Sequence, residues 1–172
     1  MNQDAYFSLI YEVDDDVVLK TSWLFEQPGS SASNGDRWHY VSDTLFHSNL
    51  LQNKRHVLRV LQQRPHIHIM EAIDVDQPEG IYLRRCRSLS KNEIPPQLHR
   101  IRWYRELADA LCHLHSFGIA HADIRFENIL FDHQDAAILC DFSAASSFGQ
   151  ANSVFPDIPL PINVMAYWFY QK

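Results

Sequence analysis

The stretch His121–Asn128 (HADIRFEN) decides the fold, together with Asp141–Ser143 (DFS), which begins thirteen residues after Asn128. A carboxylate at Asp123 and a carboxamide at Asn128 lie at the two ends of a short loop, and a second carboxylate at Asp141 follows an expected strand. Such oxygens are typical ligands of Mg2+ where a nucleotide phosphate supplies the remaining ones. Phosphoryl transfer also needs a group that accepts the hydroxyl proton. The spacing is therefore typical of a site that transfers phosphoryl groups.

The two motifs resemble the catalytic loop H-R-D-x-x-x-x-N and the D-F-G motif of the protein kinase family. Upstream, Val17–Lys20 (VVLK) resembles the V-A-I-K strand of that family, and residues 111–119 resemble the end of the helix that leads into its catalytic loop. The resemblance covers roughly residues 8–143. It implies an α+β, two-lobed protein-kinase-like fold with a small antiparallel-sheet N-lobe and an incomplete helical C-lobe.

The resemblance also implies a role for each matching residue. Asp123 would be the catalytic base, and Arg125 stands where the family usually has a lysine that contacts the transferred phosphate. Lys20 would pair with the phosphates of ATP, and Asn128 and Asp141 would hold Mg2+. An alternative for Asp123 and Asn128 is a capped loop in which their side chains only satisfy backbone groups.

Hydrophobic periodicity and turn residues predict the elements around these motifs. We expect one protein-kinase-like domain over residues 1–172, with the N-lobe at about 1–86 and a partial C-lobe at 87–172 that ends within the activation segment. Ser42 or Asp43 could cap the first helix. The expected elements are strands at 6–13 and 17–25, a loop at 26–37, a helix at 43–62, strands at 67–75 and 80–86, a helix at 96–116, and extended pieces at 128–131 and 136–140.

Two departures from the kinase pattern concern the nucleotide. The chain has no G-x-G-x-x-G, because its first glycine is Gly29, already past Lys20. No acidic residue occurs between 44 and 58, where the family's C-helix has a glutamate that pairs with the lysine; Asn53 and Lys54 occupy the place. We therefore expect Lys20 to lack its partner and to be poorly aimed.

Two further departures concern the activation segment. Ala122 replaces the arginine that in protein kinases commonly binds the phosphorylated activation loop, and Ser143 replaces the glycine of D-F-G. The chain also stops 31 residues after Asp141 with no A-P-E motif. We expect an apolar tail to cover the 96–116 helix in part and to leave an apolar patch open, the covering residues being Phe155, Ile158, Leu160, Trp168 and Phe169.

Composition narrows the partners. The sequence is 46% hydrophobic and 21% charged, a composition typical of a globular domain. Its net charge of −6 argues against nucleic acid as a partner. It has no run of about 18 apolar residues and no basic, apolar leader, so no membrane partner is expected and the location would be cytoplasmic or nuclear. The expected partners are a nucleotide and a protein that is a substrate or covers the incomplete C-lobe.

Three functions stay open at this point. The first is weak ATP- and Mg2+-dependent phosphoryl transfer to a Ser/Thr hydroxyl of a protein. The second is a pseudokinase, a binding or scaffold module without turnover, which the missing glycine loop and glutamate favour. The third is a small-molecule kinase of the aminoglycoside-phosphotransferase type, which shares the H-x-D-x-x-x-x-N loop but fits Phe142 and Ser143 less well.

Overall fold

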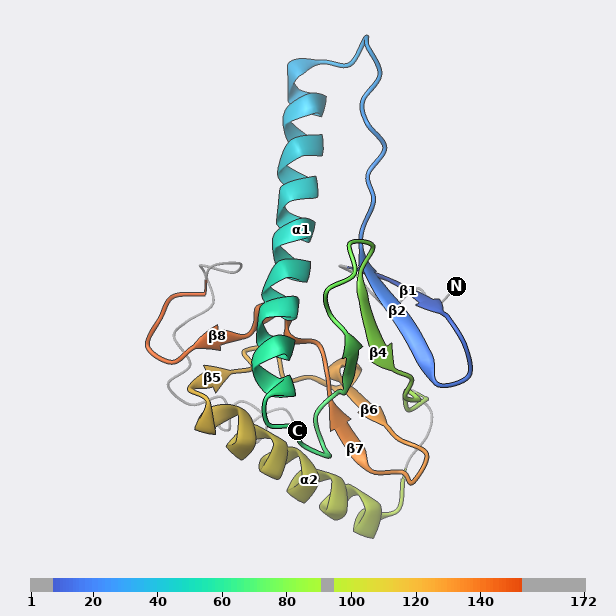
Figure 1. Cartoon of the computed structure of the whole chain (residues 1–172), viewed down its shortest axis with the longest axis vertical. Helices are drawn as coiled ribbons and strands as arrows, with labels where there is room; N and C mark the ends of the chain where they lie inside the picture. Colours follow the sequence, from blue (N-terminus) through green and yellow to red (C-terminus); the bar gives the residue numbers. More distant parts are fainter. Residues whose placement is uncertain (1–7, 91–94, 153–172) are drawn as a thin grey trace.

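The computed structural model describes residues 8–90 and 95–152, and all structural statements concern these residues. A small sheet lies beside the C-terminal half of the long helix α1, and a second helix, α2, lies with several short strands near that same end of α1 (Figure 1). The mixed α+β architecture predicted from the sequence is confirmed. The apolar tail expected to cover α2, from Phe155 to Phe169, lies outside the described residues.

The sheet has four antiparallel strands in the order β1-β2-β4-β3. A polar turn of aspartates separates its first two strands, and Asp16 donates its backbone N–H to Oδ1 of Asp14 across 2.8 Å. The small antiparallel sheet expected for the N-lobe is therefore present. Its strands are β1 (Ser8–Glu12), β2 (Val17–Ser22), β3 (Ala72–Asp74) and β4 (Ile81–Arg84).

Helix α1 (Asn34–Gln62) begins nine residues before the start expected at position 43. Its N-terminus is a reciprocal capping box, in which Ser33 Oγ accepts from the Asp36 N–H at 3.2 Å and Asp36 Oδ2 accepts from the Ser33 N–H at 3.0 Å. Two donors that would lack helical partners are thereby satisfied. The expected loop to residue 37 and the caps at Ser42 or Asp43 are wrong.

The expected strand at 67–75 is present only as β3, which covers its last part. The residues before β3 pair instead with strand β7 (Ala137–Leu139). Met70 donates its N–H to the Leu139 carbonyl at 2.9 Å, and Leu139 donates to the His68 carbonyl at 2.9 Å. This pairing joins the N-terminal half of the chain to the loops that follow α2.

Helix α2 (Gln97–Ser116) agrees with the helix expected at 96–116. Its buried face consists of Trp103, Leu107, Ala110 and Leu114. Leu98 and Ile101 on the same helix are exposed. Neither α1 nor α2, the two long helices of the described residues, has the length and hydropathy that a bilayer span requires.

Short elements after α2 place the two motifs. A hairpin of β6 (Ile129–Phe131) and β7 separates them, so Asn128 lies just before the hairpin and Asp141 just after it. Across its base, Cys140 donates its N–H to the Asn128 carbonyl at 3.0 Å. The other short elements are β5 (Ile119–Ala120), which pairs with β8 (Ser146–Ser147), and the 3-10 turns η1 (Phe126–Asn128) and η2 (Phe142–Ala144).

One hydrophobic core joins the sheet, both helices and the β6–β7 hairpin. Burial of these apolar side chains holds the surrounding loops in a fixed relation to one another. The largest fully buried apolar side chains are Leu58, Ile81, Leu114, Phe131, Leu139 and Phe142. Phe142 of the D-F-S motif belongs to this core, so the residue before it is fixed in position.

Candidate active site

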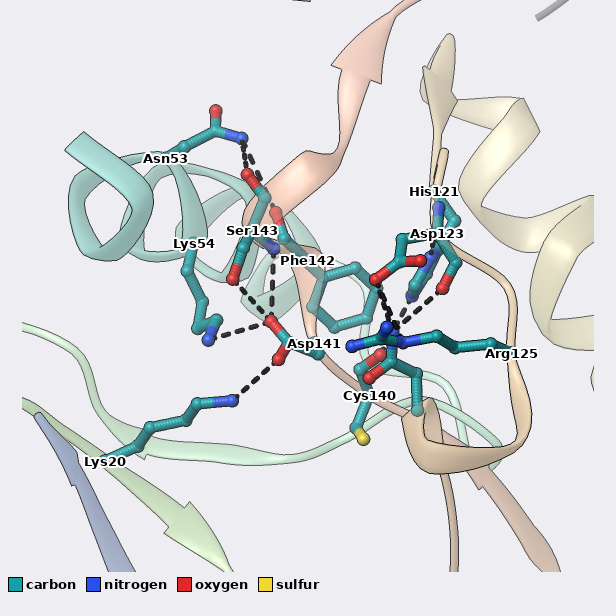
Figure 2. Close-up of polar contacts among 11 residues, drawn as sticks. Lys20, Asn53, Lys54, His121, Asp123, Arg125, Cys140, Asp141, Phe142 and Ser143 are labelled. Carbon is teal, nitrogen blue, oxygen red and sulfur yellow. Dashed lines mark hydrogen bonds and ion pairs between the residues drawn. The ribbon is translucent and has the colours of Figure 1, made fainter. Parts of the chain in front are cut away.

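Strand β2 presents the side chain of Lys20 to the segment that follows β7. Lys20 Nζ lies 2.9 Å from Asp141 Oδ2 (Figure 2). Burial alone would lower the pKa of Lys20, but the charges of Asp141 and Cys140 and the hydrogen bonds with Lys54 and Asp141 together outweigh it, and the pKa is raised. The expectation that Lys20 lacks a partner is wrong, because a carboxylate from the other half of the chain replaces the missing glutamate.

Helix α1 supplies a second lysine to the same carboxylate. Lys54 is only 2% exposed, and its Nζ lies 2.9 Å from Asp141 Oδ1. Burial lowers the pKa of Lys54 to about 7; the charge of Asp141 opposes this and that of Lys20 reinforces it. Sequence reasoning placed Lys54 where the family has its glutamate but gave it no role.

The carboxylate of Asp141 is therefore held by two ammonium groups. Burial would raise the pKa of Asp141, but the charges of Lys54 and Lys20 hold it well below the ordinary value. Oδ1 also accepts from the hydroxyl and the backbone N–H of Ser143. The Asp141 backbone is left-handed, with φ 63°, a conformation that costs a non-glycine residue energy unless its surroundings enforce it.

Asn53, beside Lys54 on α1, fixes the segment after Asp141. Its Nδ2 lies 2.9 Å from the carbonyl oxygen of Ser143 (Figure 2) and 2.9 Å from that of Ala145. Buried carbonyls need such donors, because an unsatisfied polar group is costly. Asn53 was named from the sequence, but this contact was not predicted. The available signal was that Asn53 and Lys54 occupy the place where the kinase C-helix has its glutamate.

The second group of polar residues lies on the loop before β6. Asn128 Nδ2 donates to the backbone carbonyl of Asp123 at 2.8 Å and to its Oδ2 at 2.8 Å. Arg125 Nε lies 3.4 Å from the same Oδ2. Asn128 is buried, whereas the side chains of Asp123 and Arg125 are partly exposed. Asn128 thus satisfies a backbone group, as in a capped loop, and also orients the Asp123 carboxylate.

His121 connects the two groups. Its buried Nε2 lies 2.9 Å from the Cys140 carbonyl, and its Nδ1 lies 3.3 Å from the Asp123 N–H. Because a carbonyl can only accept, Nε2 carries the proton and Nδ1 accepts. Burial lowers the pKa of His121, which agrees with a neutral ring. His121 therefore fixes Asp123 relative to the segment of Asp141.

The structure thus arranges the five residues singled out from the sequence in two adjacent groups. Lys20 and Asp141 form an ion pair, and Asp123, Arg125 and Asn128 form the neighbouring group (Figure 2). The backbone of Cys140 joins them, since it donates to Asn128 and accepts from His121.

This arrangement does not fit a magnesium ion at Asp141. Each carboxylate oxygen of Asp141 forms an ion pair with a lysine ammonium group, and these positive charges would repel a divalent cation placed beside them. Mg2+ also demands a near-octahedral set of oxygen ligands. Asn128 directs its amide nitrogen to Asp123, so only its amide oxygen could face a metal ion. Among residues 8–90 and 95–152, no cluster of three His, Cys, Asp or Glu residues could hold a metal ion.

Comparison with known proteins places these features in a family. Residues 40–167 match the family model described as the protein kinase domain. The chain is 30% identical over 160 residues to a serine/threonine-protein kinase-like protein of Arabidopsis thaliana, covering 88% of this chain and 46% of that protein.

Two further relatives match over shorter stretches. MAP kinase-interacting serine/threonine-protein kinase 2 of Xenopus laevis is 27% identical over 129 residues, which is 57% of this chain and 28% of that protein. Testis-specific serine/threonine-protein kinase 5 of Mus musculus is 39% identical over 72 residues, which is 42% of this chain and 18% of that protein. The chain thus spans less than half the length of each of these relatives.

Proposed function

Because this chain belongs to the protein kinase domain family, we propose that it binds ATP and transfers the terminal phosphoryl group slowly to a protein Ser/Thr hydroxyl. Protein kinases in general use ATP and Mg2+. The hydrogen bond from Asn128 to the Asp123 carboxylate carries the proposal, because it gives the general base a fixed direction at 2.8 Å. A base must be held within reach of the hydroxyl whose proton it accepts.

Asp123 would accept the proton of the Ser/Thr hydroxyl as that oxygen attacks the γ-phosphorus, and the bond from the γ-phosphorus to the bridging oxygen would break to release ADP. Arg125 lies 3.4 Å from Asp123 Oδ2, and its guanidinium would neutralise charge on the transferred group. Lys20 would bind the phosphates, for which its ammonium must turn from Asp141.

The rate would be low because the Asp141 carboxylate is held by its two lysines. In protein kinases the D-F-G aspartate serves the metal ion. Here the same carboxylate neutralises Lys20 and Lys54, so we assign no step of the transfer to a metal ion at Asp141. Positioning and the charges of the side chains would supply what acceleration there is.

Transfer of labelled phosphate tests this function. The protein is incubated with γ-labelled ATP and a mixture of Ser/Thr-containing proteins, in parallel with Asp123→Asn and with Asp43→Asn, an exposed position on α1. We expect Asp123→Asn to lower the rate by about 10²-fold or more with ATP affinity retained, since the base and not a phosphate ligand is removed. Equal rates for the wild type and Asp123→Asn would contradict the proposal.

A second candidate is a pseudokinase that binds nucleotide without turnover. The observation that favours it is the ion pair of Lys54 with Asp141, which occupies a carboxylate needed for catalysis elsewhere in the family. The same experiment separates the two candidates. ATP binding without any label above background in the wild type would favour the pseudokinase.

A further inference from the structure

The charge around Asp141 is unusual for a site beside bound phosphates and Mg2+. Lys20 and Lys54 contribute two formal positive charges against the single negative charge of Asp141. A glutamate at position 54, as the kinase pattern has it, would make the same trio net negative. The present trio is formally positive, so it attracts an anion and repels a free divalent cation.

Both lysines are largely buried, and the cluster meets solvent chiefly at its carboxylate. The side chains of Lys20 and Lys54 are 10% and 3% exposed, whereas that of Asp141 is 26% exposed. Lys54 therefore acts on a ligand chiefly through Asp141, whose negative charge it compensates. With that charge compensated by Lys54, the ammonium of Lys20 can leave Asp141 Oδ2, 2.9 Å away, and pair with an incoming anion.

We propose that this site takes a nucleoside polyphosphate as the free anion, without a divalent cation, and that Lys54 is the residue that makes the cation unnecessary. The inference rests on the nucleotide binding of the proposed function. In a site with an uncompensated aspartate, a metal ion screens that carboxylate from the phosphates. Here the buried ammonium of Lys54 already occupies that place, with its nitrogen 2.9 Å from Oδ1.

The fixed backbone around Asp141 supports this assignment. Asn53 holds the carbonyls of Ser143 and Ala145 at 2.9 Å, so the segment cannot swing out to meet a metal ion without losing both hydrogen bonds. Ser143 also donates to Asp141 Oδ1 through its hydroxyl and its backbone N–H. Coordination of Mg2+ through Asp141 would have to break an ion pair and these contacts together.

Calorimetric titration with ATP, in excess EDTA and in excess Mg2+ at matched ionic strength, tests the inference. The full chain is used at pH 6.5. We expect the dissociation constants in the two buffers to agree within about threefold, because the site has no uncompensated negative charge for the metal to screen. Mg2+ alone, without nucleotide, should leave the thermal unfolding midpoint unchanged, since a ligand that binds the folded state must raise it.

Substitution of Lys54 supplies the complementary test. Lys54→Glu should weaken ATP binding in EDTA by at least tenfold, and Mg2+ should restore much of the loss. Lys54→Met removes the positive charge without adding a negative one, and it provides the test if Lys54→Glu does not fold. Its ATP affinity should depend on Mg2+ less than that of Lys54→Glu does. Arg59→Glu changes the net charge equally from an exposed position on α1 and should bind ATP alike in both buffers.

The outcomes separate this inference from the function beneath it. Tighter binding of ATP with Mg2+ by tenfold or more in the wild type would overturn the inference and leave the proposed function standing. Equal Mg2+ dependence of the wild type and both Lys54 variants would also overturn it. No ATP binding in either buffer would overturn the inference and the proposed function together.

Discussion

Lys54 Nζ on α1 lies 2.9 Å from Asp141 Oδ1, and this buried ion pair joins the long helix to the end of the β6–β7 hairpin. Asn53, the preceding residue, holds two carbonyls of the same segment. Lys54 thus occupies the helix position where the kinase pattern has a glutamate, and it binds Asp141 of the D-F-S motif. The ion pair has consequences for stability that can be measured separately from any activity.

Stability should rise with pH just above neutrality because of Lys54. Its pKa is lowered from 10.5 in the unfolded chain to about 7 in the folded one, chiefly by burial. Between these values the unfolded chain binds more protons, so the free energy of unfolding increases with pH. We expect roughly 1 kcal/mol per pH unit between pH 7.5 and 8.5 from urea unfolding.

Lys54→Met is the control for that rise, because it has no ammonium to titrate. Its unfolding free energy should change much less over the same interval. Above about pH 9 the partly buried thiols oppose the trend, since burial raises the pKa of Cys86 to about 11 and that of Cys140 to about 12. Parallel pH profiles for the wild type and Lys54→Met would show that the folded lysine keeps its ordinary pKa.

Asn53→Ala should loosen the segment after Asp141. The substitution removes the amide that donates to the Ser143 and Ala145 carbonyls at 2.9 Å. Loss of donors to partly buried carbonyls costs about 1–3 kcal/mol. Urea unfolding should show that loss, and the amides of residues 143–145 should exchange hydrogen faster. Gln52→Ala, exposed on the neighbouring position of α1, should change neither quantity; equal effects of the two variants would contradict the assigned contact.

The turn before β4 packs closely against β2 at Gly80, where there is no room for a side chain. A Cβ at Gly80 would lie 2.5 Å from the Lys20 carbonyl oxygen and 2.8 Å from Leu19 Cδ1, too close for either group. Gly80→Ala should therefore destabilise the domain by about 1–3 kcal/mol. It should also weaken ATP binding, because the backbone that carries Lys20 must shift.

Gly29→Ala is the matched control for Gly80, since no atom lies within 4 Å of the added Cβ. Its effect on the thermal unfolding midpoint should be small, or slightly stabilising because the unfolded chain loses freedom. If the two alanine variants unfold at the same midpoint, the close packing of the turn against β2 is not as described.

The main elements of the fold were predictable because their signals are local. The apolar period of residues 96–116 predicted α2 within one residue at its start. The start of α1 was missed although Ser33 and Asp36 have the spacing of a capping box, because the Pro, Gly and Ser residues before them indicated a loop. The pairing of Met70 with Leu139 depends on contacts between distant parts of the chain, which no local pattern reports.

The candidate site was predictable as a set of residues but not as a set of contacts. The motif spacing and its resemblance to the kinase motifs predicted Asp123, Asn128 and Asp141 as site residues. The missing glutamate was interpreted as a loss, whereas Lys54 forms a new ion pair in its place. That outcome depends on which face of α1 meets η2, and the helix period does not specify how the helix is rotated against a distant loop.

The central claim is that Lys20 binds the phosphates of ATP at the site formed with Asp141. The most direct test is titration calorimetry of ATP against the wild type and Lys20→Met, with Arg59→Met as the exposed control cation on α1. The account predicts ATP binding by the wild type and by Arg59→Met, and binding at least about tenfold weaker for Lys20→Met, or 1.4 kcal/mol. Equal ATP affinity of the wild type and Lys20→Met, or no binding by any of the three, would contradict it.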